Sequence, residues 1–193
     1  MSQDCGCGCS PTGVSSTQRR QVIRMAVAGA AAPWLMGVSP AHAAAVAGDR
    51  LVEEDAEGTP TPLKLSDLKV GRPMLAYPFD AKKGVVRNES RLNKIVLLRV
   101  AESDMDAKTA ARSAAGVMAY SAICTHQGCD VKTWLSKEKA LVCFCHSSKF
   151  QLLEGGVVSS GPANRALPSV PLKLEGEQLV IAGGFSTPPG VSG

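Results

Sequence analysis

Two short runs of cysteine and histidine are the residues of this chain whose types and spacing could do chemistry. They read Cys124-Thr-His126-Gln-Gly128-Cys129 and Cys143-Phe-Cys145-His146. Each run offers a thiolate and an imidazole, and each carries one further cysteine. Thiolates and imidazoles bind zinc, and they also bind iron–sulfur clusters. The sequence therefore predicts one metal centre to which both runs contribute.

The spacing within the first run favours an iron–sulfur cluster over zinc. Zinc sites usually separate paired ligands by two to four residues and close into a single tetrahedron. One residue alone separates Cys124 from His126, which fits that pattern poorly. It fits better a [2Fe–2S] cluster in which two thiolates hold one iron and two imidazoles hold the other. Zinc and a purely structural cysteine cluster remain the alternatives.

The two runs resemble the paired boxes C-x-H-x-G-C and C-x-C-H-x-S of the Rieske iron–sulfur family, in the same order and at the family spacing. The resemblance implies one [2Fe–2S] cluster per chain. Cys124 and Cys143 would bind one iron through sulfur, and His126 and His146 would bind the other, solvent-facing iron.

The same resemblance implies roles for residues around the ligands. Cys129 and Cys145 would form a disulfide that ties the two cluster loops together. Ser148 would donate a hydrogen bond to a bridging sulfide, whereas Phe150 lacks the phenol that tyrosine supplies in quinol-oxidising relatives. The remaining positions expected to shape or shield the cluster are Gly128 of the first box and Gly161-Pro162, which resembles the family's proline loop but could be an ordinary turn.

The number of histidines limits the chemistry. The chain has three, and His42 lies in a segment that we expect to be removed. An oxygenase of this family would need two more histidines and a carboxylate for a mononuclear iron. We therefore expect a protein that passes electrons and has no substrate-converting site of its own.

The first 43 residues have the pattern of an export signal. Arg19-Arg20 and the apolar residues behind them resemble the twin-arginine signal, and Ala41-His42-Ala43 is a small-x-small cleavage pattern. The alternative is an uncleaved membrane anchor, but the apolar stretch 25–38 is shorter than the ~20 residues that span a bilayer. We expect cleavage after Ala43 and a periplasmic location. No role is assigned to the three leading cysteines, Cys5, Cys7 and Cys9.

Composition excludes one class of partner. The formal net charge is +4, aromatic residues make up 4% of the chain, and no basic run follows the signal. Nucleic-acid binding needs a basic patch and usually aromatic stacking, so we expect no nucleic-acid partner. A membrane would be a partner only if the signal stays in place as an anchor.

Short apolar strands alternate with glycine and proline turns along the rest of the chain. The clearest strands are 94–100, 117–123 and 140–142, and the last two lead directly into the two boxes. Residues 74–77 are expected to form a strand that Pro78 halts, and 102–115 to form a loop, with an exposed helical turn as the alternative. Two hairpins are expected, one pairing 150–153 with 157–158 and the other pairing 171–175 with 178–181.

No amphipathic helix is apparent, so the pattern predicts an all-β sandwich. The Rieske resemblance implies an antiparallel β sandwich into which a small cluster-binding subdomain is inserted. The expected organisation is a twin-arginine signal peptide in 1–43, a linker or N-terminal arm in 44–62, a Rieske domain in 63–185 with its cluster-binding subdomain at about 120–168, and a C-terminal tail in 186–193.

Within the family, the lead-in 117–123, Tyr77-Pro78 and Phe150 resemble the small subunit of periplasmic arsenite oxidase. That resemblance implies an electron-transfer subunit that takes electrons from a catalytic, molybdopterin-containing partner and passes them to a cytochrome c or a cupredoxin. The insertion 102–115 and the tail 185–193 depart from the pattern, which leaves the catalytic partner open. The alternatives are a membrane-anchored Rieske subunit of a quinol–cytochrome c reductase and a stand-alone periplasmic carrier.

Overall fold

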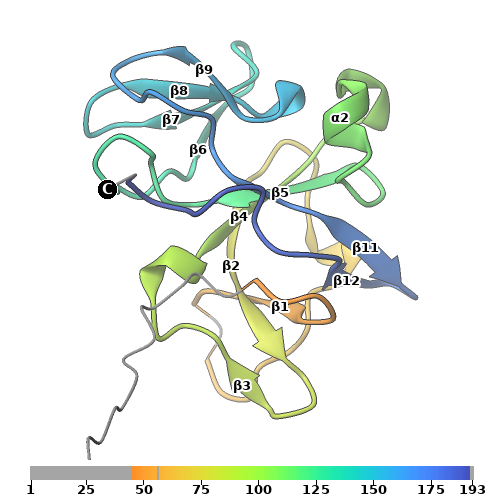
Figure 1. Cartoon of the computed structure of the whole chain (residues 1–193). Helices are drawn as coiled ribbons and strands as arrows, with labels where there is room; N and C mark the ends of the chain where they lie inside the picture. The colour runs from red at the N-terminus through yellow and green to blue at the C-terminus, as the bar shows by residue number, and fades with distance from the viewer. Residues whose placement is uncertain (1–44, 56, 192–193) are drawn as a thin grey trace, which may run out of the picture. The chain divides into compact units, whose positions relative to one another are not determined.

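Two antiparallel sheets hold nearly all of the regular structure in residues 45–55 and 57–191, which are the residues that the computed structural model describes (Figure 1). The larger sheet has the strand order β10-β5-β4-β2-β1-β12-β11, with β3 paired to β2. Its strands are β1 (Arg50–Glu53), β2 (Met74–Asp80), β3 (Val85–Val86), β4 (Ile95–Arg99), β5 (Val117–Ser121), β10 (Ser169–Val170), β11 (Leu172–Glu175) and β12 (Gln178–Ile181). The prediction of an all-β fold is confirmed.

The smaller sheet is an insertion between two neighbouring strands of the larger one. Its order is β6-β7-β8-β9, and its strands are β6 (Thr133–Leu135), β7 (Ala140–Cys143), β8 (Ser148–Gln151) and β9 (Val157–Ser160). The chain leaves the larger sheet at the end of β5 and returns at β10, which pairs with β5 through Ser169 and Tyr120. The expected insertion of a small subdomain into a larger antiparallel domain is therefore present.

Strands β4 and β5 join two hydrophobic cores because both of their faces are buried. In β4, Ile95 and Leu97 belong to the core of the larger sheet, whereas Val96 and Leu98 belong to a second core under the smaller sheet. This alternation follows from the two-residue period of a strand. The free cysteines Cys124 and Cys143 belong to the second core. The two strands thus hold the cluster loops on a rigid base.

Two predictions about the N-terminal part of the domain are wrong. Arg50–Glu53, inside the predicted linker or arm, forms β1, which lies between β2 and β12. Pro78 does not halt its strand, because β2 continues to Asp80. The carbonyl of Pro78 accepts a hydrogen bond from the Arg87 N–H at 2.8 Å, just beyond β3. The N–H that proline lacks would point the same way, where β2 changes partner from β4 to β3 and no ladder bond is required.

The segment 102–115, predicted as a loop, contains a 3₁₀ turn η3 (Glu102–Asp104) and a short helix α2 (Ala107–Ala110). Asp106 caps the helix by accepting from the Thr109 N–H at 2.7 Å. The other 3₁₀ turns are η1 (Leu65–Asp67), η2 (Arg91–Asn93) and η4 (Leu152–Glu154). None of the helices in the described part of the chain is long and apolar enough to cross a membrane.

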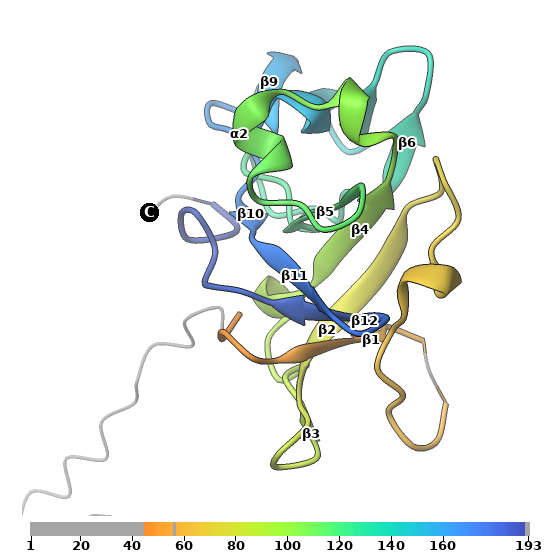
Figure 2. The same cartoon turned by 90° about the vertical axis from the view of Figure 1, so that its right-hand side faces the viewer.

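The α2 segment is fastened to the base of the smaller sheet (Figure 2). The Asp106 N–H donates to the Leu153 carbonyl at 2.9 Å, and the Gly155 N–H donates to Thr109 Oγ1 at 2.8 Å. Below them, the buried Tyr120 hydroxyl donates to the Leu152 carbonyl at 2.7 Å. Burial raises the pKa of Tyr120 to about 12, so this hydroxyl stays protonated and remains a donor. The Tyr120 bond connects η4 directly to β5, and the other two connect the α2 segment to η4 and to Gly155.

Candidate metal centre

The first box is a tight loop closed by its own backbone. The Gly128 N–H donates to the Cys124 carbonyl at 3.0 Å, and the Cys124 N–H donates to the Cys129 carbonyl at 2.8 Å. Gly128 has φ +74°, a left-handed conformation that side chains disfavour, and so glycine is suited to the position. The loop follows β5 directly, which fixes where Cys124 and His126 lie.

A charge cluster ties the far end of this loop to the larger sheet. The Asp130 carboxylate accepts from Lys94 Nζ at 2.9 Å and also pairs with Arg91. Lys94 is buried and binds Glu54 as well, at 2.6 Å. Burial alone would raise the pKa of Asp130, but the hydrogen bonds from the two bases outweigh it and lower that pKa. The carboxylate therefore stays charged and anchors the loop.

The second box begins at the last residue of β7, and a disulfide joins it to the first. Cys129 and Cys145 are bonded, with their Cα atoms 6.6 Å apart, as the resemblance implied. Cys124 and Cys143 remain as free, buried thiols. The Cys143 Sγ lies within 4.8 Å of both disulfide sulfurs. A disulfide sulfur is not a thiolate, so the Cys143 sulfur lies near the bridge but does not form a three-sulfur metal site with it.

The two free thiols lie against each other. Burial raises the pKa of the Cys124 thiol, and its hydrogen bond with Cys143 raises it further. The backbone N–H groups of His126 and Gln127 donate to the Cys124 sulfur and oppose this effect. Two adjoining thiols with backbone donors aimed at one sulfur suit a metal, because the metal would take up the charge of both thiolates.

The two histidine rings of the boxes lie against each other. Their centroids are 4.7 Å apart and their planes are nearly perpendicular, at 87°. His126 is half-buried, and its Nδ1 is buried without a hydrogen-bond partner, whereas His146 is exposed. A buried ring nitrogen without a partner is costly unless something binds it. The described part of the chain contains no other histidine.

These residues fit a mixed-ligand [2Fe–2S] cluster better than zinc. One buried pair of thiols and one pair of imidazoles supply the two ligand types that such a cluster needs. A metal bond would satisfy the His126 Nδ1, which is buried without a hydrogen-bond partner, and the disulfide removes two of the four cysteines that a closed zinc site could use.

The proline loop packs directly on the second box. A Cβ added to Gly161 would lie 2.5 Å from the Ser148 Cα and 2.8 Å from the Ser147 carbonyl oxygen. The Ala163 N–H donates to Ser148 Oγ at 3.2 Å, which leaves the hydroxyl hydrogen free to donate elsewhere. Pro162 is exposed at the tip of this loop. The predicted neighbours of the cluster are thus brought together in space.

Phe150 lies beneath the site. It is fully buried in β8 and belongs to the same core as Cys124 and Cys143. The opposite, outer side of the second box is exposed, and Phe144 there has 73% of its surface open to solvent. The site therefore has a dry inner side with the thiols and an open outer side with His146.

Sequence reasoning missed Ser147, which follows the ligand candidate His146. Ser147 has φ +58°, the left-handed region that non-glycine residues disfavour. This turn aims His146 outward and Ser148 inward, since one is exposed and the other buried. A serine gives no sequence signal for such a conformation.

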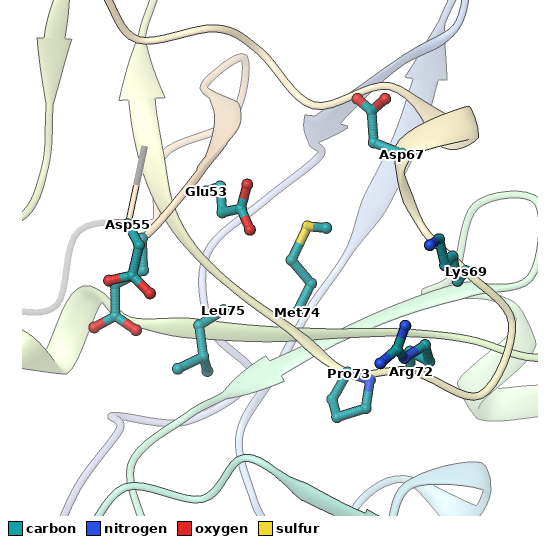
Figure 3. Close-up of a pocket in the computed structure, with 9 residues that line it drawn as sticks. Glu53, Asp55, Asp67, Lys69, Arg72, Pro73, Met74 and Leu75 are labelled. Atoms are coloured by element: carbon teal, nitrogen blue, oxygen red, sulfur yellow. The ribbon is translucent and has the colours of Figure 1, made fainter. Parts of the chain in front are cut away.

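A surface hollow elsewhere is not a second centre. It has a volume of about 360 Å³ and lies between the end of β1 and the start of β2 (Figure 3). Glu53 and Asp55 line one side of it, and Asp67, Lys69 and Arg72 line the other. Its lining includes no cysteine or histidine. The hollow is an open patch of mixed charge and lacks the thiol and imidazole groups of the site described above.

A family model described as the Rieske [2Fe-2S] domain matches residues 74–171, a span that contains both boxes, the smaller sheet and the proline loop. The chain belongs to the Rieske family. The cofactor of this Rieske domain is accordingly a [2Fe–2S] cluster, one per chain, as the ligand types indicated.

Two relatives and one solved structure illustrate the family. A Haloferax mediterranei protein provisionally named the Rieske subunit of a respiratory nitrate reductase is 36% identical over 128 residues, 65% of this chain and 54% of that protein. A cytochrome bc1 complex Rieske iron-sulfur subunit of Streptomyces lividans is 33% identical over 136 residues, 68% of this chain and 80% of that protein. The soluble domain of Rieske protein II from Sulfolobus acidocaldarius is 23% identical, with a TM-score of 0.40, over 52% of this chain and 66% of that one. This chain therefore spans about half the length of the first of these relatives.

Proposed function

We propose that this Rieske protein is the electron-transfer subunit of an oxidoreductase complex outside the cytoplasm. It would take single electrons from a catalytic partner subunit and pass them to a cytochrome c or a cupredoxin. Cys124 and Cys143 would hold one iron of the cluster, and His126 and His146 the other. The observation that carries the proposal is the pairing of two buried thiols with two adjoining imidazoles, one of which faces solvent.

The chain's residues would create two unlike sides around the cofactor. The cluster, when bound, supplies a one-electron redox couple. The thiol side is enclosed by the second core, the disulfide joins the two boxes, and the proline loop packs on the second box. The imidazole side is open, with exposed His146 next to exposed Phe144. A partner that docks on this side would come within electron-transfer reach, because no protein layer intervenes.

The finer proposal is a small subunit similar to that of periplasmic arsenite oxidase, with a molybdopterin-containing partner. It is supported by Phe150, which is buried in the same core as the free cysteines, at a position where quinol-oxidising relatives carry tyrosine. Export by the twin-arginine route and a periplasmic location belong to the same proposal. They rest on residues 1–43, which lie outside the described residues.

A second candidate is the Rieske subunit of a quinol–cytochrome c reductase. The observation in its favour is the 33% identity to the Streptomyces lividans protein, which is named as a cytochrome bc1 complex subunit. The two candidates differ in the cofactor of the partner, since one partner carries molybdenum and the other carries haem b.

Native purification of the exported protein with its partners distinguishes the candidates. The chain should be isolated with its partners from both the soluble periplasmic fraction and the membrane fraction, and metals and haem measured in each product. We expect molybdenum in stoichiometric amount and no haem b. Haem b in a membrane-bound complex would replace the proposal with the quinol reductase. Isolation of the chain with iron alone would instead indicate a stand-alone carrier.

Two substitutions should shift the reduction potential in opposite directions. A hydrogen bond to a cluster sulfur favours the more negative, reduced form, so Ser148→Ala should lower the potential and Phe150→Tyr should raise it. A bond that contributes about 1.4 kcal/mol corresponds to about 60 mV in a one-electron couple. Protein-film voltammetry measures both shifts.

Phe79→Tyr, which adds a hydroxyl to a buried ring in β2, is the control and should leave the potential unchanged. An unchanged potential in Phe150→Tyr would show that the ring does not face a cluster sulfur.

A further inference from the structure

The chain does not end its fold at β12 but returns toward the first box. We call residues 185–191 the C-terminal strap. At its start, Phe185 packs on the core of the larger sheet. The Ser186 N–H donates to the Ser169 carbonyl at 2.8 Å, and Ser186 Oγ accepts from the Ser169 N–H at 3.0 Å. The strap is therefore fixed along β10 before it reaches the cluster site.

The end of the strap lies against the first cluster loop (Figure 1). Gly190 is buried, and a Cβ added to it would lie 2.9 Å from Leu92 Cδ2 and 3.9 Å from Ile123 Cγ2. The Val191 Cγ2 atom lies 3.8 Å from where a Cβ on Gly128 would be. Ile123 precedes Cys124, and Gly128 precedes Cys129. The strap thus covers the loop at both of its ends.

One arginine holds this strap in place. The guanidinium of Arg165, in the segment after the proline loop, donates to the side chain of Thr187 at 3.2 Å and to the Pro188 carbonyl at 2.9 Å. It also donates to the Gly190 carbonyl. Its Nε is buried without a partner, an unfavourable burial that the three bonds to the strap offset. A planar fork of donors suits several carbonyls at once, whereas the single ammonium of lysine does not.

The backbone of Arg165 holds the first loop itself. The Thr125 hydroxyl, buried between Cys124 and His126, donates to the Arg165 carbonyl at 2.8 Å. One residue therefore bonds to the cluster loop through its main chain and to the strap over that loop through its side chain.

We propose that Arg165 is a positioning residue of the cluster site, which latches the C-terminal strap over the first box and so keeps Cys124 and His126 in place. The role rests on the ligand assignment in the proposed function. Without the latch, the strap leaves Ile123 and Gly128 uncovered, and water gains access to the loop that carries half of the ligands. The loop then opens more often and releases the cluster faster.

The test compares five forms of the cluster-loaded protein: wild type, Arg165→Met, Arg165→Lys, a truncation that removes residues 186–193, and Arg99→Met. Arg99 is a matched control because its guanidinium also donates to two backbone carbonyls, those of Leu65 and Leu68, at 3.2 and 3.4 Å. Two quantities are measured: the lifetime of the visible absorption in a chelator, and hydrogen exchange of the Gly128 amide, which donates within the first loop.

Arg165→Met and the truncation should each shorten the cluster lifetime by about tenfold, the lower end of the roughly 10–100-fold loss of metal affinity that follows removal of a group bonded to a metal ligand, because the strap acts on the ligand loop and not on a ligand itself. The Gly128 amide should exchange faster in both forms and be unchanged in Arg99→Met. Arg165→Lys, which keeps the charge but not the planar fork of donors, should restore part of the lifetime.

Variants that match the wild type in cluster lifetime and amide exchange would overturn the latch. An equal effect in Arg99→Met would overturn it as well, by indicating general destabilisation. A wild-type protein that binds no iron would instead overturn the proposed function on which the role rests.

Discussion

Replacing both Cys129 and Cys145 by serine should lower the free energy of unfolding by about 2–4 kcal/mol and make the protein lose its cluster readily. The bridge closes a loop with a sequence separation of 16 residues, and its loss frees the unfolded chain. In the native state it also joins the two boxes, each of which supplies one thiol and one imidazole. Without it, no covalent cross-link joins the two loops, which are then held in place only by contacts such as the Asp130–Lys94 ion pair and the Thr125–Arg165 hydrogen bond. Denaturant unfolding followed by circular dichroism measures the stability, and visible absorption measures the cluster.

Treating the wild-type protein with a mild reductant is the control, because it opens the bridge without replacing a residue. Reduced wild type and the double variant should agree in stability. Reaction of both cysteines with a thiol reagent in native, exported protein would contradict the bridge. So would a double variant as stable as the wild type.

Gly161→Ala should destabilise the protein by about 2 kcal/mol or more and open the proline loop. The added Cβ would lie 2.5 Å from the Ser148 Cα and 2.7 Å from its N, so backbone must move. Gly161 also has φ +87°, which alanine adopts only with strain. The displaced loop would carry Ala163 with it and break the bond from its N–H to Ser148 Oγ. The cluster should therefore lose stability and also shift in potential, because the Ser148 hydroxyl is no longer fixed.

Gly176→Ala is the matched control. Gly176 has φ +62° in the β11–β12 turn, and a Cβ there would have nothing within 4 Å. Both variants incur the conformational strain, but only Gly161→Ala incurs the collision. Equal losses of stability in the two variants would show that contact between the proline loop and the second box contributes nothing.

The ligand candidates were predictable because the chemistry fixes residue type and the loop geometry fixes spacing. Cys124 and His126 lie in a loop so short that its own backbone closes it. The ligand candidates are therefore close together in the sequence and form a recognisable motif. Strands β4, β5 and β7 were equally visible, since each is an apolar run that ends in polar residues or in a box.

Features that depend on distant partners were not predictable. Arg50–Glu53 is a strand only because β2 and β12 lie on either side of it, and its four residues carry no pattern of their own. Pro78 is tolerated inside β2 because β3 ends just before the residue opposite it, which the local sequence does not indicate. The contact of Arg165 with the strap joins residues more than twenty positions apart, and neither segment indicates the other. The same holds for Thr109 and Gly155, which fasten the segment predicted as a loop.

Electron paramagnetic resonance of the reduced protein, with iron and zinc measured in the same sample, tests the central claim most directly. A mixed-ligand cluster held by Cys124, Cys143, His126 and His146 predicts two irons per chain and a rhombic signal with an average g of about 1.9. His146→Cys should keep the iron but change the signal, because a thiolate would replace an imidazole. One zinc per chain without such a signal would contradict the account.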